Sequence, residues 1–238
     1  MSKELEKTQN ASLATPTNLI GMEDFGDVDS SKAIPRLQIC QAMSDTAKEA
    51  GVPEGHWYNN YELADLGDSL EFVVLKRFQS RVYLKQGEGL VCRSDDAKLC
   101  SYTVLEGVQV GLACSECQYS KWDEASKLPP PCSLAINYLV LLRDNPIPAV
   151  ISCMKTAMPA ARKFDKVLQM SLFRYGSISG GLFAVKTVKQ KSDKGTFYVP
   201  EFIPKGQAPQ NLAKMALTMR NSFSKVVVHD EKEKKEEF

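Results

Sequence analysis

Five of the seven cysteines lie in one central stretch of the chain, and their spacing is typical of a metal site. Cys114 and Cys117 form a C-x-x-C pair, Cys92 lies upstream of them, and Cys132 follows a run of prolines. Two thiolates on one tight turn can reach the same ion, and a tetrahedral Zn²⁺ then needs two ligands from elsewhere in the chain. The spacing therefore predicts a Zn²⁺ site formed by Cys92, Cys114, Cys117 and Cys132.

A closed set of four thiolates leaves no coordination position for a substrate, so the predicted metal is structural. Cys100 competes for a ligand role, because it lies eight residues after Cys92 and could replace either outer ligand. The alternatives are that only the C-x-x-C pair matters or that the cysteines are simply buried thiols. Cys40 and Cys153 lie in apolar runs, and we expect both in the core.

Catalytic chemistry has few candidate residues in this sequence. His56 and His229 are the only histidines, and they are far apart in the chain. The sequence contains no phosphate-binding loop, nucleophile elbow or dinucleotide-binding fingerprint. We therefore expect a protein that is not an enzyme.

The elements that must position the cysteines follow from the apolar pattern, which predicts a mainly β protein of the α+β class. A helix is expected over residues 157–173, where Phe164, Leu168 and Leu172 share one face, and a second over residues 208–223. Without the cysteine-rich segment, residues 70–203 read strand, strand, strand, helix, strand, strand. This is the order of an oligonucleotide-binding (OB) fold, a five-stranded barrel. The expected strands cover residues 70–78, 81–85, 134–143, 147–154, 182–191 and 196–203, and a possible edge strand covers residues 34–40.

The chain divides into four predicted parts. They are a disordered N-terminal segment (residues 1–30), an OB-fold-like domain (residues 31–205) with the zinc module inserted at residues 90–133, a C-terminal helix (residues 206–228) and an acidic tail (residues 229–238). The N-terminus lacks the apolar core of a signal peptide, and the longest apolar run, Leu134 to Leu142, is too short to span a bilayer. We expect a cytoplasmic protein, where clustered cysteines act as ligands rather than forming disulfides.

The net charge of +1 conceals a strong segregation of charge along the chain. Residues 1–69 carry 5 Lys/Arg and 12 Asp/Glu, residues 70–228 carry 22 and 12, and residues 229–238 carry 3 and 5. A basic body between acidic ends suggests a polyanion-binding surface for which the termini could compete. The alternative is ordinary scatter of surface charge.

Basic and aromatic residues interleave along the predicted strands and helix, as a single-strand binder requires for phosphates and bases. Phe78, Phe164 and Phe183 are expected in the core, whereas Tyr83, Tyr175 and Trp122 are expected on the surface. For the helical lysines the alternative is a simple solvated face. The candidate nucleic-acid contacts are Lys76, Arg77, Arg81, Tyr83, Lys155, Arg162, Lys163, Lys166, Arg174, Tyr175, Lys186 and Lys189.

The chain resembles bacteriophage single-stranded DNA-binding proteins of the zinc-containing, OB-fold type, and several short stretches are similar to a widespread set of phage early-region proteins. The resemblance covers roughly residues 34–203 and the tail. It departs from the pattern at Cys100, which is an extra cysteine, and in the lysines of the tail. The matching stretches are Ile34-Pro-Arg-Leu, Tyr58-Asn59, Cys92-Arg-Ser, Cys114-x-x-Cys117, Pro131-Cys132 and Asp193-Lys-Gly-Thr-Phe-Tyr198.

The resemblance and the charge pattern together imply a sequence-independent single-stranded DNA-binding protein of phage replication or recombination, in the host cytoplasm. It also implies that the tail, with Glu236, Glu237 and Phe238, recruits replication or recombination proteins, although a disordered solubilising end is the alternative. The rival hypothesis is a zinc-ribbon adaptor that binds host replication, transcription or nuclease subunits.

Overall fold

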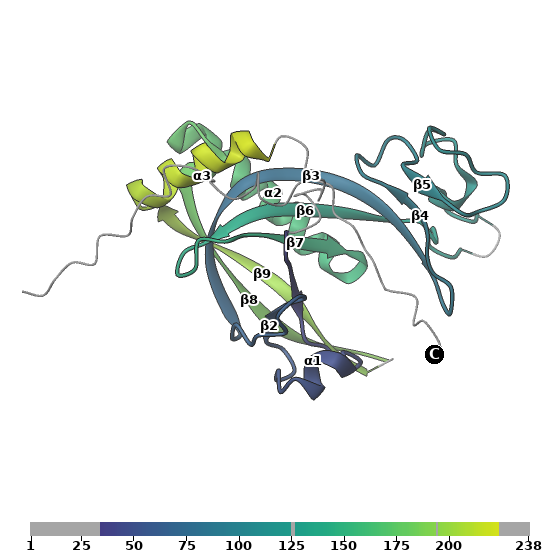
Figure 1. Cartoon of the computed structure of the whole chain (residues 1–238), viewed down its shortest axis with the longest axis horizontal. Helices are drawn as coiled ribbons and strands as arrows, with labels where there is room; N and C mark the ends of the chain where they lie inside the picture. Colours follow the sequence, from purple (N-terminus) through teal and green to yellow (C-terminus); the bar gives the residue numbers. More distant parts are fainter. Residues whose placement is uncertain (1–33, 125–126, 194, 224–238) are drawn as a thin grey trace, which may run out of the picture.

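The computed structural model describes residues 34–124, 127–193 and 195–223 (Figure 1). These residues form one large sheet flanked by helices, which confirms the mainly β, α+β class. The strands are β1 (Arg36–Ile39), β2 (Trp57–Asn59), β3 (Ser69–Lys85), β4 (Gly89–Ser94), β5 (Tyr102–Thr103), β6 (Ser133–Leu142), β7 (Pro148–Met154), β8 (Gly181–Ser192) and β9 (Gly195–Gln207), and the α-helices are α1 (Asp45–Glu49), α2 (Met158–Tyr175) and α3 (Gln210–Ser222).

β3 organises the sheet, because both of its edges are used. One edge pairs with β6 from Phe72 to Val82. The other edge pairs with β8 over Ser69–Phe72 and with β4 over Arg81–Lys85. β3 is thus one strand of 17 residues where the sequence predicted two. It arches over the molecule in Figure 1, with β4 and β5 at one end and the β8–β9 hairpin descending from the other.

The sheet runs in the order β2-β1-β7-β6-β3-β4-β5, with β8 against β3 and β9 against β8. β1 lies between β2 and β7, so the expectation of an edge strand near residues 34–40 is wrong. β1 pairs in parallel with β7 and occupies the edge of β7 on which a barrel would close. No described strand joins β7 to β9, so the predicted barrel is not closed among the residues that the structure describes.

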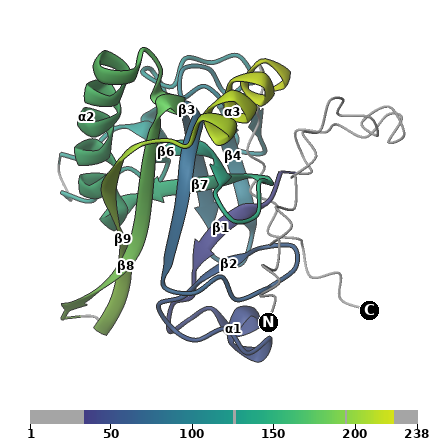
Figure 2. The same ribbon diagram turned by 90° about the vertical axis from the view of Figure 1, so that its left-hand side faces the viewer.

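α2 and α3 cover opposite faces of the sheet (Figure 2). α2 confirms the helix predicted over residues 157–173, with Pro159 in its first turn. It ends at Gly176, whose φ of 70° is left-handed, and the Gly176 N–H donates to the Leu172 carbonyl. α3 confirms the second predicted helix and packs Leu212, Ala216 and Met219 against the other face.

A cluster of aromatic rings fills the space between α2 and the sheet. Phe164 stacks on Phe202 with ring centroids 4.2 Å apart and meets Tyr138 edge-on at 5.0 Å. Phe72 and Phe183 complete the cluster. Such pairs contribute roughly 0.5–1.5 kcal/mol each beyond area burial. Phe164 and Phe183 are therefore core residues, as predicted, and are not available to stack with bases.

The predicted disordered N-terminal segment and acidic tail, including Glu236, Glu237 and Phe238, lie outside the described residues. In the part of the chain that is described, no helix has both the length and the apolar character needed to cross a membrane.

Candidate functional site

The cysteine-rich segment connects β3 to β6 and contributes β4 and β5 to the edge of the sheet. Its five cysteines are all buried, all are free thiols, and all line one cavity of about 10 Å³. This volume is about what one water molecule occupies. The predicted quartet of Cys92, Cys114, Cys117 and Cys132 therefore shares its cavity with Cys100.

Backbone hydrogen bonds tie the loop of Cys100 to the C-x-x-C turn. The Cys100 N–H donates to the Leu112 carbonyl at 2.9 Å, and the Cys114 N–H donates to the Lys98 carbonyl at 2.7 Å. An isolated β-bridge between Leu99 and Ala113 lies between these two bonds. The backbone thus holds Cys100 and the C-x-x-C pair in one unit, whereas Cys92 belongs to strand β4.

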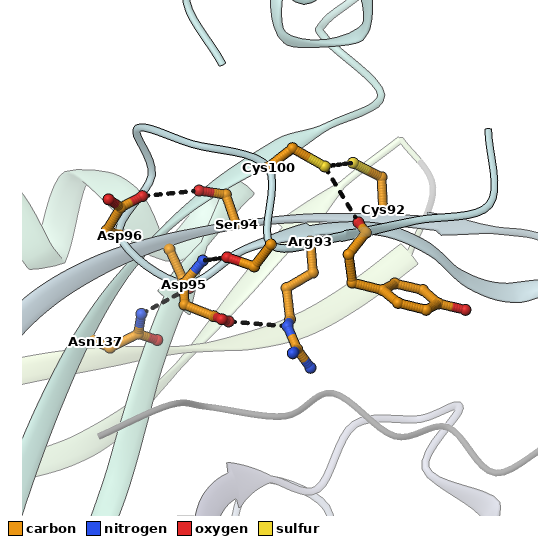
Figure 3. Close-up of polar contacts among 10 residues, drawn as sticks. Cys92, Arg93, Ser94, Asp95, Asp96, Cys100 and Asn137 are labelled. Atoms are coloured by element: carbon orange, nitrogen blue, oxygen red, sulfur yellow. Dashed lines mark hydrogen bonds and ion pairs between the residues drawn. The ribbon is translucent and has the colours of Figure 1, made fainter. Parts of the chain in front are cut away.

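The thiols of Cys92 and Cys100 lie next to each other in the lining of the cavity, with their sulfurs 3.8 Å apart (Figure 3). The Cys100 thiol also lies 3.5 Å from the Tyr102 carbonyl oxygen. Burial, together with the neighbouring Cys100 thiol, raises the pKa of Cys92 to about 12. Burial raises the pKa of Cys132 to about 11, and the Cys114 and Cys117 thiols add to this rise while Arg81 opposes it.

Among the described residues, no group of three or more His, Cys, Asp or Glu side chains surrounds one point closely enough to hold a metal ion. The cysteines converge on one cavity, but their sulfurs are not arranged as a closed coordination shell. Rotation about χ1 between staggered positions moves a cysteine sulfur by about 3 Å. The backbone therefore brings the ligand types together, and side-chain rotation decides whether they converge on an ion.

Two residues predicted to contact nucleic acid lie beside this cavity instead of on an open face. The Arg81 Nη1 lies 3.4 Å from the Cys132 carbonyl oxygen, which accepts its hydrogen bond. The ring of Tyr83 packs on Tyr119, with centroids 5.7 Å apart, in the cluster that includes Cys92 and Cys100. Sequence reasoning did not connect either residue with the cysteines, because the contacts cross from β3 to the inserted segment.

The other two predicted contacts of β3 lie on its opposite faces. Arg77 forms a two-armed ion pair with Asp165 of α2, at 2.9 and 3.3 Å. Lys76 faces α3, where burial and the nearby Arg220 guanidinium lower the pKa of the lysine. Arg77 therefore joins α2 to the sheet, and Lys76 belongs to the surface shared with α3.

The outer face of α2 gathers the predicted helical contacts. Arg162, Lys163, Lys166 and Arg174 are all exposed. The single carboxylate of the helix, Asp165, is engaged by Arg77. Phe173 is 83% exposed and Met170 is 54% exposed on the same helix. α2 thus presents a cationic face with exposed apolar side chains, which we call the α2 face; its residues are Arg162, Lys163, Lys166, Met170, Phe173 and Arg174.

The remaining predicted contacts are distributed around the sheet. Lys155 is exposed just before α2, and Tyr175, at its end, is half-buried. Lys186 pairs with Glu201 across the β8–β9 hairpin at 2.9 Å, and Lys189 is exposed farther along that hairpin. Trp122 is 64% exposed, as predicted. Cys40 and Cys153 are buried in the core, also as predicted.

The sequence reasoning missed a polar chain that crosses four strands on the sheet face opposite α2. Asn137 donates to Ser80 at 2.8 Å, Ser152 donates to Asn137 at 2.7 Å, and Arg36 donates to Ser152 at 3.1 Å. Burial lowers the pKa of Arg36 to about 10. Asn137, fully buried in an otherwise apolar run, is the signal that could have revealed this chain.

The fold and the cavity define an α+β protein whose arched sheet carries a cysteine-lined pocket in the connection between β3 and β6. The chain belongs to the family of Pam3 phage gp34-like proteins, whose family model matches residues 6–229. This confirms the phage origin that the resemblance implied; the description of the family names no ligand or activity. No curated protein and no solved structure matches the chain.

Proposed function

We propose that this protein binds single-stranded DNA without sequence preference. The observation that carries the proposal is the α2 face, where four exposed cations lie on one helix with Phe173 and with no unpaired carboxylate. Cations placed along a surface contact successive phosphates, and an exposed ring stacks with a base of any type. A surface of this composition needs no sequence code.

The strand pairing supports an OB-like ancestry for this binding role. β3, β6 and β7 form a meander, α2 follows, and β8 returns to β3 before forming a hairpin with β9. An OB fold has the same succession, with its helix between the third and fourth strands. In this protein β1 takes the place next to β7 that the last strand would take, so the proposed relationship is to an opened barrel.

The proposal predicts steep salt dependence in a titration of the full-length protein with a fluorescently labelled oligothymidine. Each phosphate contact contributes a slope of about −0.7 to log K against log salt for single strands, so four contacts give about −3. Fluorescence anisotropy measures both affinity and slope. A flat titration at low salt would exclude single-strand binding.

Variants of the α2 face test its part in the binding. Lys163→Glu with Lys166→Glu should weaken binding by about tenfold or more and reduce the salt slope by about 1.4, since two contacts are lost. Phe173→Ala should weaken binding by about fivefold or more with little change in slope, because stacking is not ionic. The matched control is Lys214→Glu with Arg220→Glu, which reverses two exposed cations on α3 across the sheet. Equal losses for α2 and α3 variants would show general charge attraction and no defined α2 site.

A second candidate function, a protein-binding adaptor, is favoured by the surface of the cysteine-rich segment. Val104, Val110, Trp122 and Leu128 are each more than 60% exposed there. Several exposed apolar side chains on one short segment of the chain are a feature of protein interfaces. Trp122→Ser with Val110→Ser should then abolish co-sedimentation with purified host replication, transcription or nuclease subunits while leaving oligothymidine binding unchanged. Loss of DNA binding in this variant would instead place the DNA on the cysteine-rich segment.

A further inference from the structure

The cavity is lined by five cysteines, whereas the spacing predicts a site of four. The question is therefore which four of the five thiols bind the ion. Cys92, Cys100, Cys114, Cys117 and Cys132 line one space with room for about one atom-sized occupant. A tetrahedral ion takes four ligands, so one thiol must have another role. The backbone and the hydrogen bonds of the cavity indicate which one.

We propose that the cavity binds one Zn²⁺ through Cys100, Cys114, Cys117 and Cys132, and that Cys92 is a positioning residue that donates its S–H to the Cys100 thiolate. Cys100 thus replaces Cys92 in the ligand set expected from sequence.

Three of the ligands come from one hydrogen-bonded unit. The Cys100 N–H to Leu112 and Cys114 N–H to Lys98 bonds, with the Leu99–Ala113 bridge between them, fix Cys100 beside the C-x-x-C turn. The Ser120 hydroxyl lies within hydrogen-bond reach of the carbonyls of both Cys114 and Cys117, and its single O–H braces the turn by donating to one of them. Three thiols on one braced unit can converge on an ion by side-chain rotation alone.

The fourth ligand, Cys132, immediately precedes β6. The Cys132 N–H donates to the Tyr119 carbonyl at 2.9 Å, which ties Cys132 to the segment just after the C-x-x-C turn. Arg81 contacts the Cys132 carbonyl oxygen from β3. When the four thiols release their protons to solvent and bind Zn²⁺, the site carries a net charge of −2, and the Arg81 guanidinium offsets part of it.

Cys92 is the thiol left for an outer role. It lies in β4, opposite Thr103 of β5 and next to a register shift in the pairing of β4 with β3, and its sulfur is 3.8 Å from that of Cys100 (Figure 3). Two thiolates on one Zn²⁺ also lie about 3.8 Å apart, so this distance alone fits both roles. The backbone favours Cys100, because Cys100 is bonded directly to the unit that carries Cys114, whereas Cys92 pairs with Tyr83 of β3 and Thr103 of β5. Outer partners of this kind orient metal ligands.

The test uses the full-length protein reduced, freed of metal and titrated with Zn²⁺ and Co²⁺. Metal content per chain and competition with a chromophoric chelator give stoichiometry and affinity, and Co²⁺ absorption reports the geometry and the number of thiolates. Wild type should bind one ion with a tetrahedral four-thiolate spectrum. Absence of such a spectrum would overturn the site.

Single replacements distinguish Cys100 from Cys92. Cys100→Ser should lower affinity by more than a hundredfold and cut the sulfur-to-cobalt absorption by about one quarter, because one of four thiolates is lost. Cys92→Ser should keep the four-thiolate spectrum and lose about 10–100-fold in affinity. The reverse pattern, with the spectrum kept in Cys100→Ser and changed in Cys92→Ser, would overturn the assignment.

Two further variants guard against misfolding and unspecific effects. If Cys100→Ser does not fold, Cys100→His decides, because a nitrogen ligand at this position gives a three-sulfur, one-nitrogen spectrum. A four-sulfur spectrum in Cys100→His would place Cys92 in the shell and contradict the proposal. Cys40→Ala, in a buried cysteine outside the cavity, should leave metal content and spectrum unchanged.

Discussion

The Asp96 carboxylate holds the loop that carries Cys100. It accepts hydrogen bonds from the backbone N–H groups of Lys98 and Leu99, at 2.7 and 2.9 Å, and from the Ser94 hydroxyl at 3.2 Å (Figure 3 shows the bond to Ser94). The Leu99 and Lys98 N–H groups favour the ionised carboxylate and lower the pKa of Asp96 below 3.8. One side chain thereby fixes the turn from which Cys100 enters the cavity.

We expect Asp96→Ala to lower the free energy of unfolding at pH 7 by about 1 kcal/mol, because an exposed, charge-assisted set of hydrogen bonds is lost. A carboxylate with a lowered folded-state pKa stabilises above its unfolded pKa of about 3.9, and this stabilisation disappears as pH falls through the folded value. The difference between wild type and variant should therefore shrink below about pH 4. Urea titrations between pH 3 and pH 7 measure it.

The control is Asp144→Ala, which removes an exposed carboxylate in the β6–β7 turn. At pH 7, Asp144→Ala should lower the free energy of unfolding by less than Asp96→Ala does. A constant difference between wild type and Asp96→Ala at all these pH values would contradict the charge-dependent role given to Asp96.

At the residue scale, the sequence identifies the cysteines well and their neighbours poorly. Local spacing places Cys114 and Cys117 on one turn, and nothing distant is needed to predict that. Whether Cys92 or Cys100 faces the C-x-x-C turn depends on hydrogen bonds to Leu112 and Lys98, which form only after the segment folds back. Arg81 was assigned to DNA because its charge is visible in the sequence, whereas its contact with Cys132 is not.

At the element scale, one glutamine side chain takes the place of strand pairing. The Gln41 amide donates to the Tyr198 carbonyl at 2.8 Å and accepts from the Tyr198 N–H at 2.9 Å, so it binds β9 as a neighbouring strand would. Gly55 packs against the same residue, and a Cβ there would lie 2.6 Å from the Tyr198 ring. This contact links the segment after β1 to the hairpin that the sheet leaves unpaired on that side.

We predict that Gln41→Ala lowers the free energy of unfolding by about 1–2 kcal/mol, because both backbone groups of Tyr198 lose a partner. Hydrogen exchange of the Tyr198 amide should also accelerate, because without Gln41 its N–H can exchange through a local opening that does not require global unfolding. Chemical denaturation and exchange mass spectrometry measure the two effects. Gln190→Ala, an exposed glutamine on β8, is the control; equal effects of the two replacements would rule out the linking role.

Most elements are predictable from sequence, and their pairing is less so. β6, β7, β8, β9 and α2 lie close to their expected bounds, because each has its own apolar period. β3 appears as two strands in the sequence because Gln79 and Ser80 interrupt the apolar pattern. In the structure Arg77 meets Asp165 and Ser80 meets Asn137, so polar residues are satisfied inside a continuous strand. No local sequence pattern shows that β1, and not β9, pairs with the edge of β7.

At the scale of the whole molecule, charge is distributed unevenly along the chain. Residues 1–69 carry seven more acidic than basic groups, and residues 70–228 carry ten more basic than acidic groups. The α2 face belongs to the basic part. Acidic segments of the chain compete with DNA phosphates for the cationic side chains of the protein. Salt weakens this competition, because it screens exposed charges more than about 10 Å apart at 0.1 M.

We therefore expect neutralisation of the N-terminal acidic residues to tighten DNA binding. Glu23→Gln, Asp24→Asn, Asp27→Asn and Asp29→Asn together remove four negative charges from the full-length chain. The affinity for labelled oligothymidine should rise by about threefold at 50 mM salt, and the gain should vanish near 0.5 M, where screening is nearly complete. Anisotropy titrations at both salt concentrations measure the change.

Replacement of Glu231, Glu233, Glu236 and Glu237 by Gln gives a matched set of four charges at the other end. A larger gain from this second set would assign the competition to the C-terminal tail, and no gain from either would show that the basic surface binds DNA without opposition from the chain's own acidic ends.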